Sequence, residues 1–299
     1  MPISSRLRLI FALTIAGANA HAAECCQNSV AVVQSLSGSA SMQAPGTRNR
    51  TAVFPWEWLP AGCTIELGAK SNAVVILLNG HRFELGPGAK AEVSAESLAH
   101  TRGPVQQLEP LPPMPKSAPI AGSAPQIAGA SRIRGSEVRG LYPRDGAALL
   151  PMSAKLSFLP VAGASGYRVE LVDEQDNILL NQRVKATETE VPEGLLQAGK
   201  RYVWLVEALG PEGAIARDWT GFVTVSEEDR ARRAGLAKAA DLALLADVDF
   251  RLGLLREAQE EFLAALNLKP HDTSIQHALE LVQTALGDAK ALQQPQKRH

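Results

Sequence analysis

The sequence is poor in cysteine and aromatic residues, and it lacks the short motifs that mark common catalytic sites. Of 299 residues three are cysteine, and aromatic residues make up 5%. No Cys-x-x-Cys pair supports thiol exchange, and no Gly-x-Ser-x-Gly, His-x-x-x-His or Walker sequence occurs. His271 and His277 are six residues apart, so they do not share a helix face. We therefore expect no catalytic, cofactor-binding or metal-binding residues and no enzyme activity.

The sequence has only one long apolar run, and it lies at the start. Two arginines precede the apolar residues 9–18, which are too few to span a bilayer. Residues 20–22 read Ala-His-Ala, a cleavage signal for export. No later stretch reaches the ~18 uncharged apolar residues of a membrane helix. We expect a signal peptide at residues 1–22 and a periplasmic or secreted protein without membrane insertion after cleavage.

A strong charge of either sign is also lacking. Removing residues 1–22 leaves 28 Lys and Arg against 31 Asp and Glu, a net charge near −3. This balance argues against nucleic acid as a partner. The remaining length is too great for one small core and predicts two or three folded units, at about 100–150 residues each.

The three cysteines form an odd set. In an oxidising compartment we expect Cys63 to pair with Cys25 or Cys26, because adjacent cysteines rarely bond each other without strain. A lipid anchor on Cys25 is the alternative, although Glu24 occupies the position where bacterial lipoprotein signals carry a small residue.

Residues 23–98 are predicted to form a domain of short strands. Two of these strands, residues 73–78 and 81–85, are joined by Asn79-Gly80, the preferred pair for a tight type I′ hairpin turn. The segments Leu-Pro-Ala-Gly-Cys-Thr-Ile (59–65), Ala-Val-Val-Ile-Leu-Leu-Asn-Gly (73–80) and Phe-Glu-Leu-Gly-Pro-Gly (83–88) give this region its character. The region resembles the FecR domain of bacterial envelope proteins. The resemblance implies a β-rich fold in the periplasm, and it adds periplasmic control of a signalling receptor as one alternative function.

Three aromatic residues within this domain are the candidate recognition site. Phe54, Trp56 and Trp58 alternate along the sequence, so in an extended segment their rings point the same way. Such a row can stack on sugar rings or anchor a protein partner. Burial beneath the sheet is the alternative, because large aromatic residues usually belong to cores.

Residues 99–138 are predicted to be a linker rich in proline, alanine and glycine. Proline removes hydrogen-bond donors and favours extended geometry, which indicates a semi-stiff spacer. Recognition by a proline-binding partner is the alternative. The prolines are Pro104, Pro110, Pro112, Pro113, Pro115, Pro119 and Pro125.

Residues 139–225 are predicted to form a β-sandwich. Tyr202, Trp204, Val206 and Ala208 share one strand face, and Trp204 is expected in the core. The segment resembles a fibronectin type III-like or immunoglobulin-like domain. That resemblance places Phe158 in the core and implies a tyrosine corner at residues 196–202, in which the phenol bonds back to the main chain.

Residues 226–287 switch to helical periodicity. Ser226 is a candidate N-cap, and Asp272 can cap a last helix that ends at Gly287. Spacings of 5, 4, 3 and 5 match a tetratricopeptide repeat, which the chain resembles here. The matching residues are Gly253, Ala258, Phe262, Ala265 and Pro270. One repeat is too small to fold as an independent array, so we expect these helices to pack against the sandwich. We expect residues 288–299 to be a disordered tail.

Taken together, the modules indicate a multidomain β plus α protein that is exported and non-enzymatic. We expect an interaction or scaffold protein of the bacterial cell envelope that binds a protein partner at its helical end. A glycan-binding or peptidoglycan-binding module using the aromatic row is the alternative.

Overall fold

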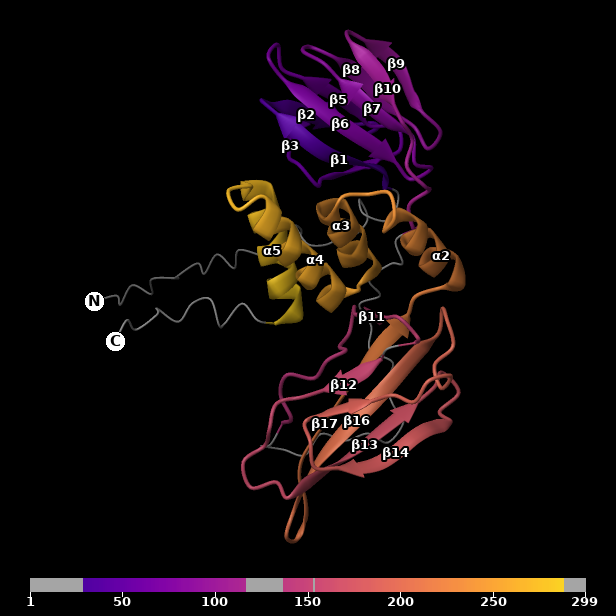
Figure 1. The fold of residues 1–299 in the computed structure, drawn as a ribbon, viewed down its shortest axis with the longest axis vertical. Coiled ribbons are helices and arrows are strands. Elements are labelled where there is room, and N and C mark those ends of the chain that lie inside the picture. The colour runs from indigo at the N-terminus through magenta and orange to yellow at the C-terminus, as the bar shows by residue number, and fades with distance from the viewer. Residues whose placement is uncertain (1–28, 117–136, 153, 288–299) are drawn as a thin grey trace, which may run out of the picture.

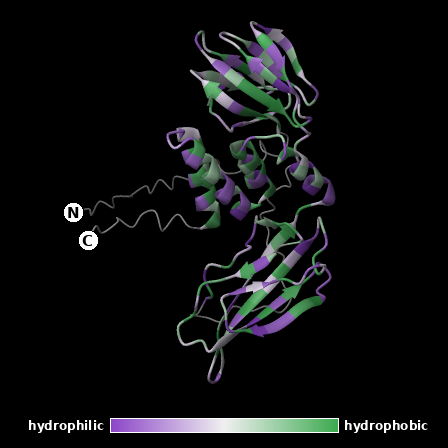
Figure 2. Ribbon diagram, in the orientation of Figure 1, coloured by the Kyte–Doolittle hydropathy of each residue, from purple (hydrophilic) through white to green (hydrophobic). Residues whose placement is uncertain are grey.

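The computed structural model describes residues 29–116, 137–152 and 154–287. The expected signal peptide, Cys25, Cys26 and the expected tail lie outside these ranges. Figure 1 shows the architecture: two β-domains lie at opposite ends of the molecule, and a group of helices lies between them. Both the strands and the helices carry hydrophobic and hydrophilic residues in alternation (Figure 2), as expected for elements with a buried and an exposed side.

The N-terminal domain consists of two five-stranded sheets. The first has the order β10 (Val105–Leu108), β7 (Arg82–Leu85), β6 (Asn72–Leu77), β1 (Ser29–Ser37), β4 (Trp58–Pro60). The second has the order β3 (Arg50–Val53), β2 (Ala40–Gln43), β5 (Thr64–Leu67), β8 (Lys90–Val93), β9 (Leu98–Arg102). Side chains from both sheets share one apolar core, so this domain is itself a sandwich.

Strand β1 is buried on both faces. Ala31 and Val33 point into the domain core, whereas Val32 between them packs against the helices. Ile76 on β6 lies on the same outer face as Val32 and is also fully buried. An antiparallel sheet usually exposes one face to water, so double burial marks the place where this sheet meets another unit.

The predicted hairpin at residues 73–85 is confirmed, but its predicted turn type is wrong. Gly80 has a φ of 90°, but the φ of Asn79 is not positive. A type I′ turn needs a positive φ at both residues, so this turn is of another type. The reason is a contact from farther along the chain. The Leu111 N–H donates to the Gly80 carbonyl at 2.9 Å, and a Cβ on Gly80 would lie 2.0 Å from the Leu111 oxygen.

The linker prediction for residues 99–138 is corrected at its first part. β9 and β10 complete the two sheets, pairing with β8 and β7. The chain then crosses to the helices: the Met114 N–H donates to the Leu78 carbonyl at 2.8 Å, and Arg232 donates to the Met114 carbonyl at 3.3 Å. The Met114 side chain is fully buried among residues of both units. Residues 117–136 lie outside the described part.

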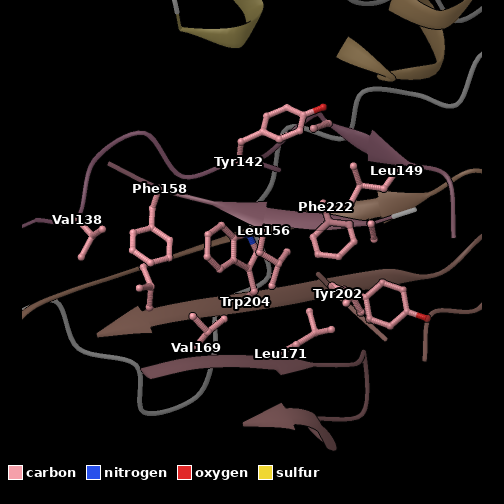
Figure 3. Close-up of a cluster of buried hydrophobic side chains, with 14 of the residues drawn as sticks. Val138, Tyr142, Leu149, Leu156, Phe158, Val169, Leu171, Tyr202, Trp204 and Phe222 are labelled. Carbon is pink, nitrogen blue, oxygen red and sulfur yellow. The ribbon is translucent and has the colours of Figure 1, made fainter. Parts of the chain in front are cut away.

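The second β-domain confirms the predicted sandwich. One sheet has the order β11 (Ala148–Leu149), β17 (Gly213–Thr224), β16 (Arg201–Gly210), β13 (Gly166–Val172), β14 (Ile178–Val184). The facing pair is β12 (Lys155–Ser157) with β15 (Glu188–Glu190). Figure 3 shows Trp204 at the centre of the core, with Phe158 beside it. The Tyr202 hydroxyl accepts a hydrogen bond from the Gln197 N–H at 2.8 Å, which confirms the predicted tyrosine corner.

Four C-terminal helices follow: α2 (Glu227–Leu236), α3 (Leu242–Leu252), α4 (Leu255–Leu268) and α5 (Thr273–Leu286). The predicted caps are confirmed: Ser226 accepts a hydrogen bond from the Asp229 N–H, and Asp272 accepts from the Ser274 and Ile275 N–H groups. Gly287 ends α5 in the left-handed conformation. None of the described helices is long and apolar enough to cross a bilayer.

Candidate functional site

The segment that carries the three predicted recognition aromatics is a turn rather than an extended row. The Phe54 N–H donates to the Glu57 carboxylate at 2.9 Å, and Trp56 has a φ of 66°, which is unusual for a residue with a side chain. Strand β4 begins only at Trp58. Phe54 is 64% exposed, whereas Trp56 and Trp58 are partly buried, so the three rings do not share one open face.

This turn is fixed to strand β1. The Trp56 N–H donates to the Val33 carbonyl at 2.7 Å, and the Val33 N–H donates to the Glu57 carbonyl at 3.0 Å. Burial raises the pKa of the Glu57 carboxyl. The Trp56–Trp58 turn is therefore held by two main-chain bonds and presents its indoles away from the domain core.

Trp58 is recognised by two residues of α3. Its indole Nε1 donates a hydrogen bond to Asp247 Oδ2 at 2.8 Å. The Arg251 guanidinium lies over the ring, with its Cζ 3.7 Å from the ring centroid. Asp247 and Arg251 are four residues apart on the helix, so they lie on one face. The edge of the indole thus makes a hydrogen bond, and its face makes a cation–π contact.

Asp247 is a buried carboxyl at a domain boundary. It is only 5% exposed, and this burial raises its pKa to about 7, against the opposing effects of the Trp58 hydrogen bond and the Arg251 charge. The next residue on α3, Val248, belongs to an apolar cluster that is shared by the helices and both β-domains. A buried polar group of this kind needs a partner, which Trp58 supplies.

Trp56 packs against two apolar clusters of the helical region, one shared with the N-terminal domain and the other within α3, α4 and α5. Its indole Nε1 is buried and has no hydrogen-bond partner in the described part of the chain. A further polar contact flanks the turn, since Gln34 Nε2 donates to Asp241 Oδ2 at 2.9 Å. Trp56, Trp58 and Gln34 thus form the N-terminal side of an interface with α3.

A buried ionic cluster joins the helices to one another. Arg233 on α2 donates to Asp249 on α3 at 2.7 Å from Nε and to Glu261 on α4 at 3.0 Å. Burial raises the pKa of both carboxyls. One guanidinium thus links three helices. Because it faces two carboxyl groups, one of the two carries no matching positive charge, and its protonated form is favoured.

The helices also bond to the sandwich. The Ala148 N–H on β11 donates to the Gly253 carbonyl at 2.8 Å, and Arg256 Nη2 donates to Ser157 Oγ at 2.6 Å. The Arg256 guanidinium lies over the Tyr142 ring, 4.0 Å from its centroid. Leu255 on α4 belongs to the core of the sandwich. The predicted docking of helices on the sandwich is present, and docking on the N-terminal domain accompanies it.

The structure brings most of the predicted repeat residues together. Ala258, Phe262 and Ala265 are buried in one cluster with the last helix. Gly253 is left-handed, with a φ of 82°, and separates α3 from α4. Pro270 follows the end of α4 at Leu268. These residues serve helix packing and turn geometry.

The remaining residues considered from the sequence are Cys63, His271 and His277. Cys63 is a buried free thiol in the described structure, and burial raises its pKa to about 12. Its expected partners, Cys25 and Cys26, lie outside the described residues, so the disulfide stays a prediction. His271 and His277 are exposed. Within the described ranges, no group of three or more His, Cys, Asp or Glu side chains is arranged to hold a metal ion.

Asp247, Arg251 and Arg233 were not among the residues predicted from the sequence. The signal available was the composition of α3, Leu-Ala-Leu-Leu-Ala-Asp-Val-Asp-Phe-Arg-Leu, in which two acids interrupt an apolar helix. Buried acids require partners, but those partners lie on α2 and on a strand almost two hundred residues earlier.

No protein-family model matches the chain, and no curated protein matches its sequence. Among solved structures it is similar to the twitchin kinase region from C. elegans, at 22% identity, covering 31% of this chain and 17% of that chain with a TM-score of 0.26. It is also similar to the fn3 domain of human collagen alpha-1(XX), at 19% identity, covering 36% and 93% with a TM-score of 0.24. A third similar structure is CopC from Methylosinus trichosporium OB3b, at 17% identity, covering 33% of this chain and 92% of that chain with a TM-score of 0.20. The sandwich is defined by its own strands and core.

Proposed function

We propose that this chain is an exported, non-enzymatic scaffold protein of the bacterial cell envelope that binds a protein partner through its helical region. The observation that supports this most strongly is the position of α2 to α5, which are packed on both β-domains through Met114 and Leu255. A helical unit fixed in this way presents a surface of constant shape. Recognition surfaces gain affinity when they are preorganised.

The modular resemblances support the same function. We propose that residues 29–108 form a FecR-like domain, that the second sandwich is fibronectin type III-like, and that Gly253 to Pro270 form a tetratricopeptide-like unit. Repeat helices of that kind bind peptides or protein surfaces. Control of a signalling receptor is a narrower form of this function and draws on the FecR resemblance alone.

The glycan-binding alternative has less support. It requires a row of open aromatic faces, and only Phe54 of the three candidates is mostly exposed. Trp58 is already covered by Arg251 and bonded to Asp247. A sugar would have to displace these contacts before it could stack on the ring.

The test is affinity purification of the mature chain from its own periplasm, with captured proteins and glycans both identified. A specific protein partner should bind the wild type and be lost with Phe262→Ala, which undermines the helical packing. The control is Ile178→Ala, because Ile178 is exposed on the edge strand β14 of the sandwich. Capture by cell-wall sacculi without any protein would instead favour the glycan alternative.

A further inference from the structure

The contact between Trp58 and α3 has the features of a side-chain recognition site. A buried carboxyl group accepts the indole N–H at 2.8 Å, and a guanidinium covers the ring face, with its Cζ 3.7 Å from the centroid. The hydrogen bond selects for a ring that carries a donor, and the cation selects for an electron-rich face. The indole of tryptophan meets both requirements, whereas phenylalanine and aliphatic side chains lack the donor.

We propose that the face of α3 around Asp247 and Arg251 is a tryptophan-binding site, filled in this chain by Trp58 and available to a tryptophan-bearing segment of the partner protein. This proposal rests on the proposed function, because it assumes that the helical region binds a protein. The ligand class is an extended peptide or loop that presents an indole. The indole of such a partner would replace the Trp58 indole and make the same contacts with Asp247 and Arg251.

Exchange is favoured over simple opening by the chemistry of Asp247. If Trp58 left without a replacement, the buried carboxyl would lose its donor, which is unfavourable. An incoming indole restores the same bond, so the site discriminates against phenylalanine and aliphatic side chains.

The turn that carries Trp58 also has two unfavourable features that a partner segment need not share. Trp56 is held at a φ of 66°, a conformation that side chains rarely adopt. Its indole Nε1 is buried without a hydrogen-bond partner in the described residues. Phe54, at the start of the same turn, is 64% exposed and marks where the turn reaches solvent. A segment free of these constraints can compete with the turn.

The test uses a fluorescein-labelled peptide with the sequence of residues 53–60, Val-Phe-Pro-Trp-Glu-Trp-Leu-Pro, titrated into the full mature chain by anisotropy. Vacating the site with Trp58→Ala should raise affinity for this probe about ten- to a hundredfold over wild type, the equivalent of one hydrogen bond to a charged group. Adding Asp247→Leu should abolish the gain. A peptide in which phenylalanine replaces the tryptophan at position 58 should not bind. The matched control is Phe54→Ala, which changes the same turn without touching Asp247 and should leave affinity at the wild-type level.

A second measurement avoids any dependence on the folding of Trp58→Ala. Hydrogen exchange of the Trp58 indole N–H in the wild-type chain should be slow, and excess probe should accelerate it. Unchanged exchange, equal probe affinity in wild type and Trp58→Ala, or a gain that survives Asp247→Leu would each overturn the site. A wild-type dimer that is lost with Trp58→Ala would assign the site to a second copy of the chain and overturn the partner assignment.

The two proposals fail in different ways. If the probe binds as expected but no envelope protein is captured, the proposed function fails and the tryptophan site stands. If a partner is captured equally by wild type and Asp247→Leu, the proposed function stands and the site is overturned as the place of partner binding.

Discussion

The main-chain N–H of Ala148 donates a hydrogen bond to the carbonyl of Gly253 at 2.8 Å, which joins strand β11 of the sandwich directly to the turn between α3 and α4. A Cβ on Gly253 would lie 2.8 Å from the Gly146 carbonyl oxygen and 3.0 Å from the Ala148 nitrogen. Gly253 therefore meets two requirements, a left-handed helix end and a close approach of two main chains.

We predict that Gly253→Ala destabilises the protein more than the same change at another left-handed helix end. Both Gly253 and Gly287 have positive φ, at 82° and 85°, so each alanine should cost about 1–2 kcal/mol for conformation. Gly287 meets only the end of the flexible Arg144 side chain. Urea unfolding should show a lower midpoint for Gly253→Ala than for Gly287→Ala, and equal midpoints would contradict the close-approach argument.

Phe262→Ala is expected to destabilise the helical region by about 3–5 kcal/mol through a cavity in the helix cluster. Phe262 is fully buried, whereas the adjacent Leu263 is 45% exposed. Leu263→Ala is therefore the control and should cost less than about 0.5 kcal/mol. Urea unfolding followed by far-ultraviolet circular dichroism should show early loss of helix in Phe262→Ala, with the β-domains persisting. Equal stability of the two variants would argue against Phe262 as the packing centre.

Local features of this fold were predictable from sequence. The caps Ser226 and Asp272, the helix end at Gly287 and the tyrosine corner at Tyr202 each depend on contacts within a few residues. For such features the residue type and its immediate neighbours supply most of the physics.

Non-local features were missed for a common reason. β9 and β10 are short, flank Pro104, and expose most of their side chains, so they lack the periodicity of buried strands. The positions of Trp56 and Trp58 depend on α3, which the chain reaches much later. The residue pattern of one segment does not show which distant segment it will contact. The candidate site lies between two such segments, the Trp56–Trp58 turn and α3.

Thiol counting tests the predicted disulfide between Cys63 and either Cys25 or Cys26. Strand pairing places Ser29, three residues after Cys26 in the sequence, opposite Pro60, three residues before Cys63. Denatured, unreduced protein should show one free thiol per chain, and three would contradict the bridge. The bridge should stabilise the fold by roughly 3–4 kcal/mol before strain. Denaturation is necessary because the thiol of Cys63 is fully buried.

The last prediction concerns the pH dependence of stability at Asp247. The carboxyl has a pKa of about 7 in the folded chain against an ordinary value of 3.8, so between these values the folded state holds a proton that the unfolded state has lost. The contribution of this group to the free energy of unfolding should therefore fall as pH rises from 4 to 7 and level off above 7, with a ceiling of about 4 kcal/mol. Burial also raises the pKa values of Asp249, Glu257 and Glu261, which adds slope in the same direction.

Asp247→Asn isolates the contribution of this one group. The amide oxygen still accepts the Trp58 N–H but cannot titrate, so the variant should show a flatter profile between pH 4 and 7 and gain relative stability at pH 7. Glu212→Gln is the control for replacing an acid with its amide, because Glu212 is exposed in the turn after β16. The measurement is urea unfolding at a series of pH values. Parallel profiles for wild type and Asp247→Asn would show that Asp247 titrates alike in both states, and that the Trp58 contact holds an ordinary carboxylate.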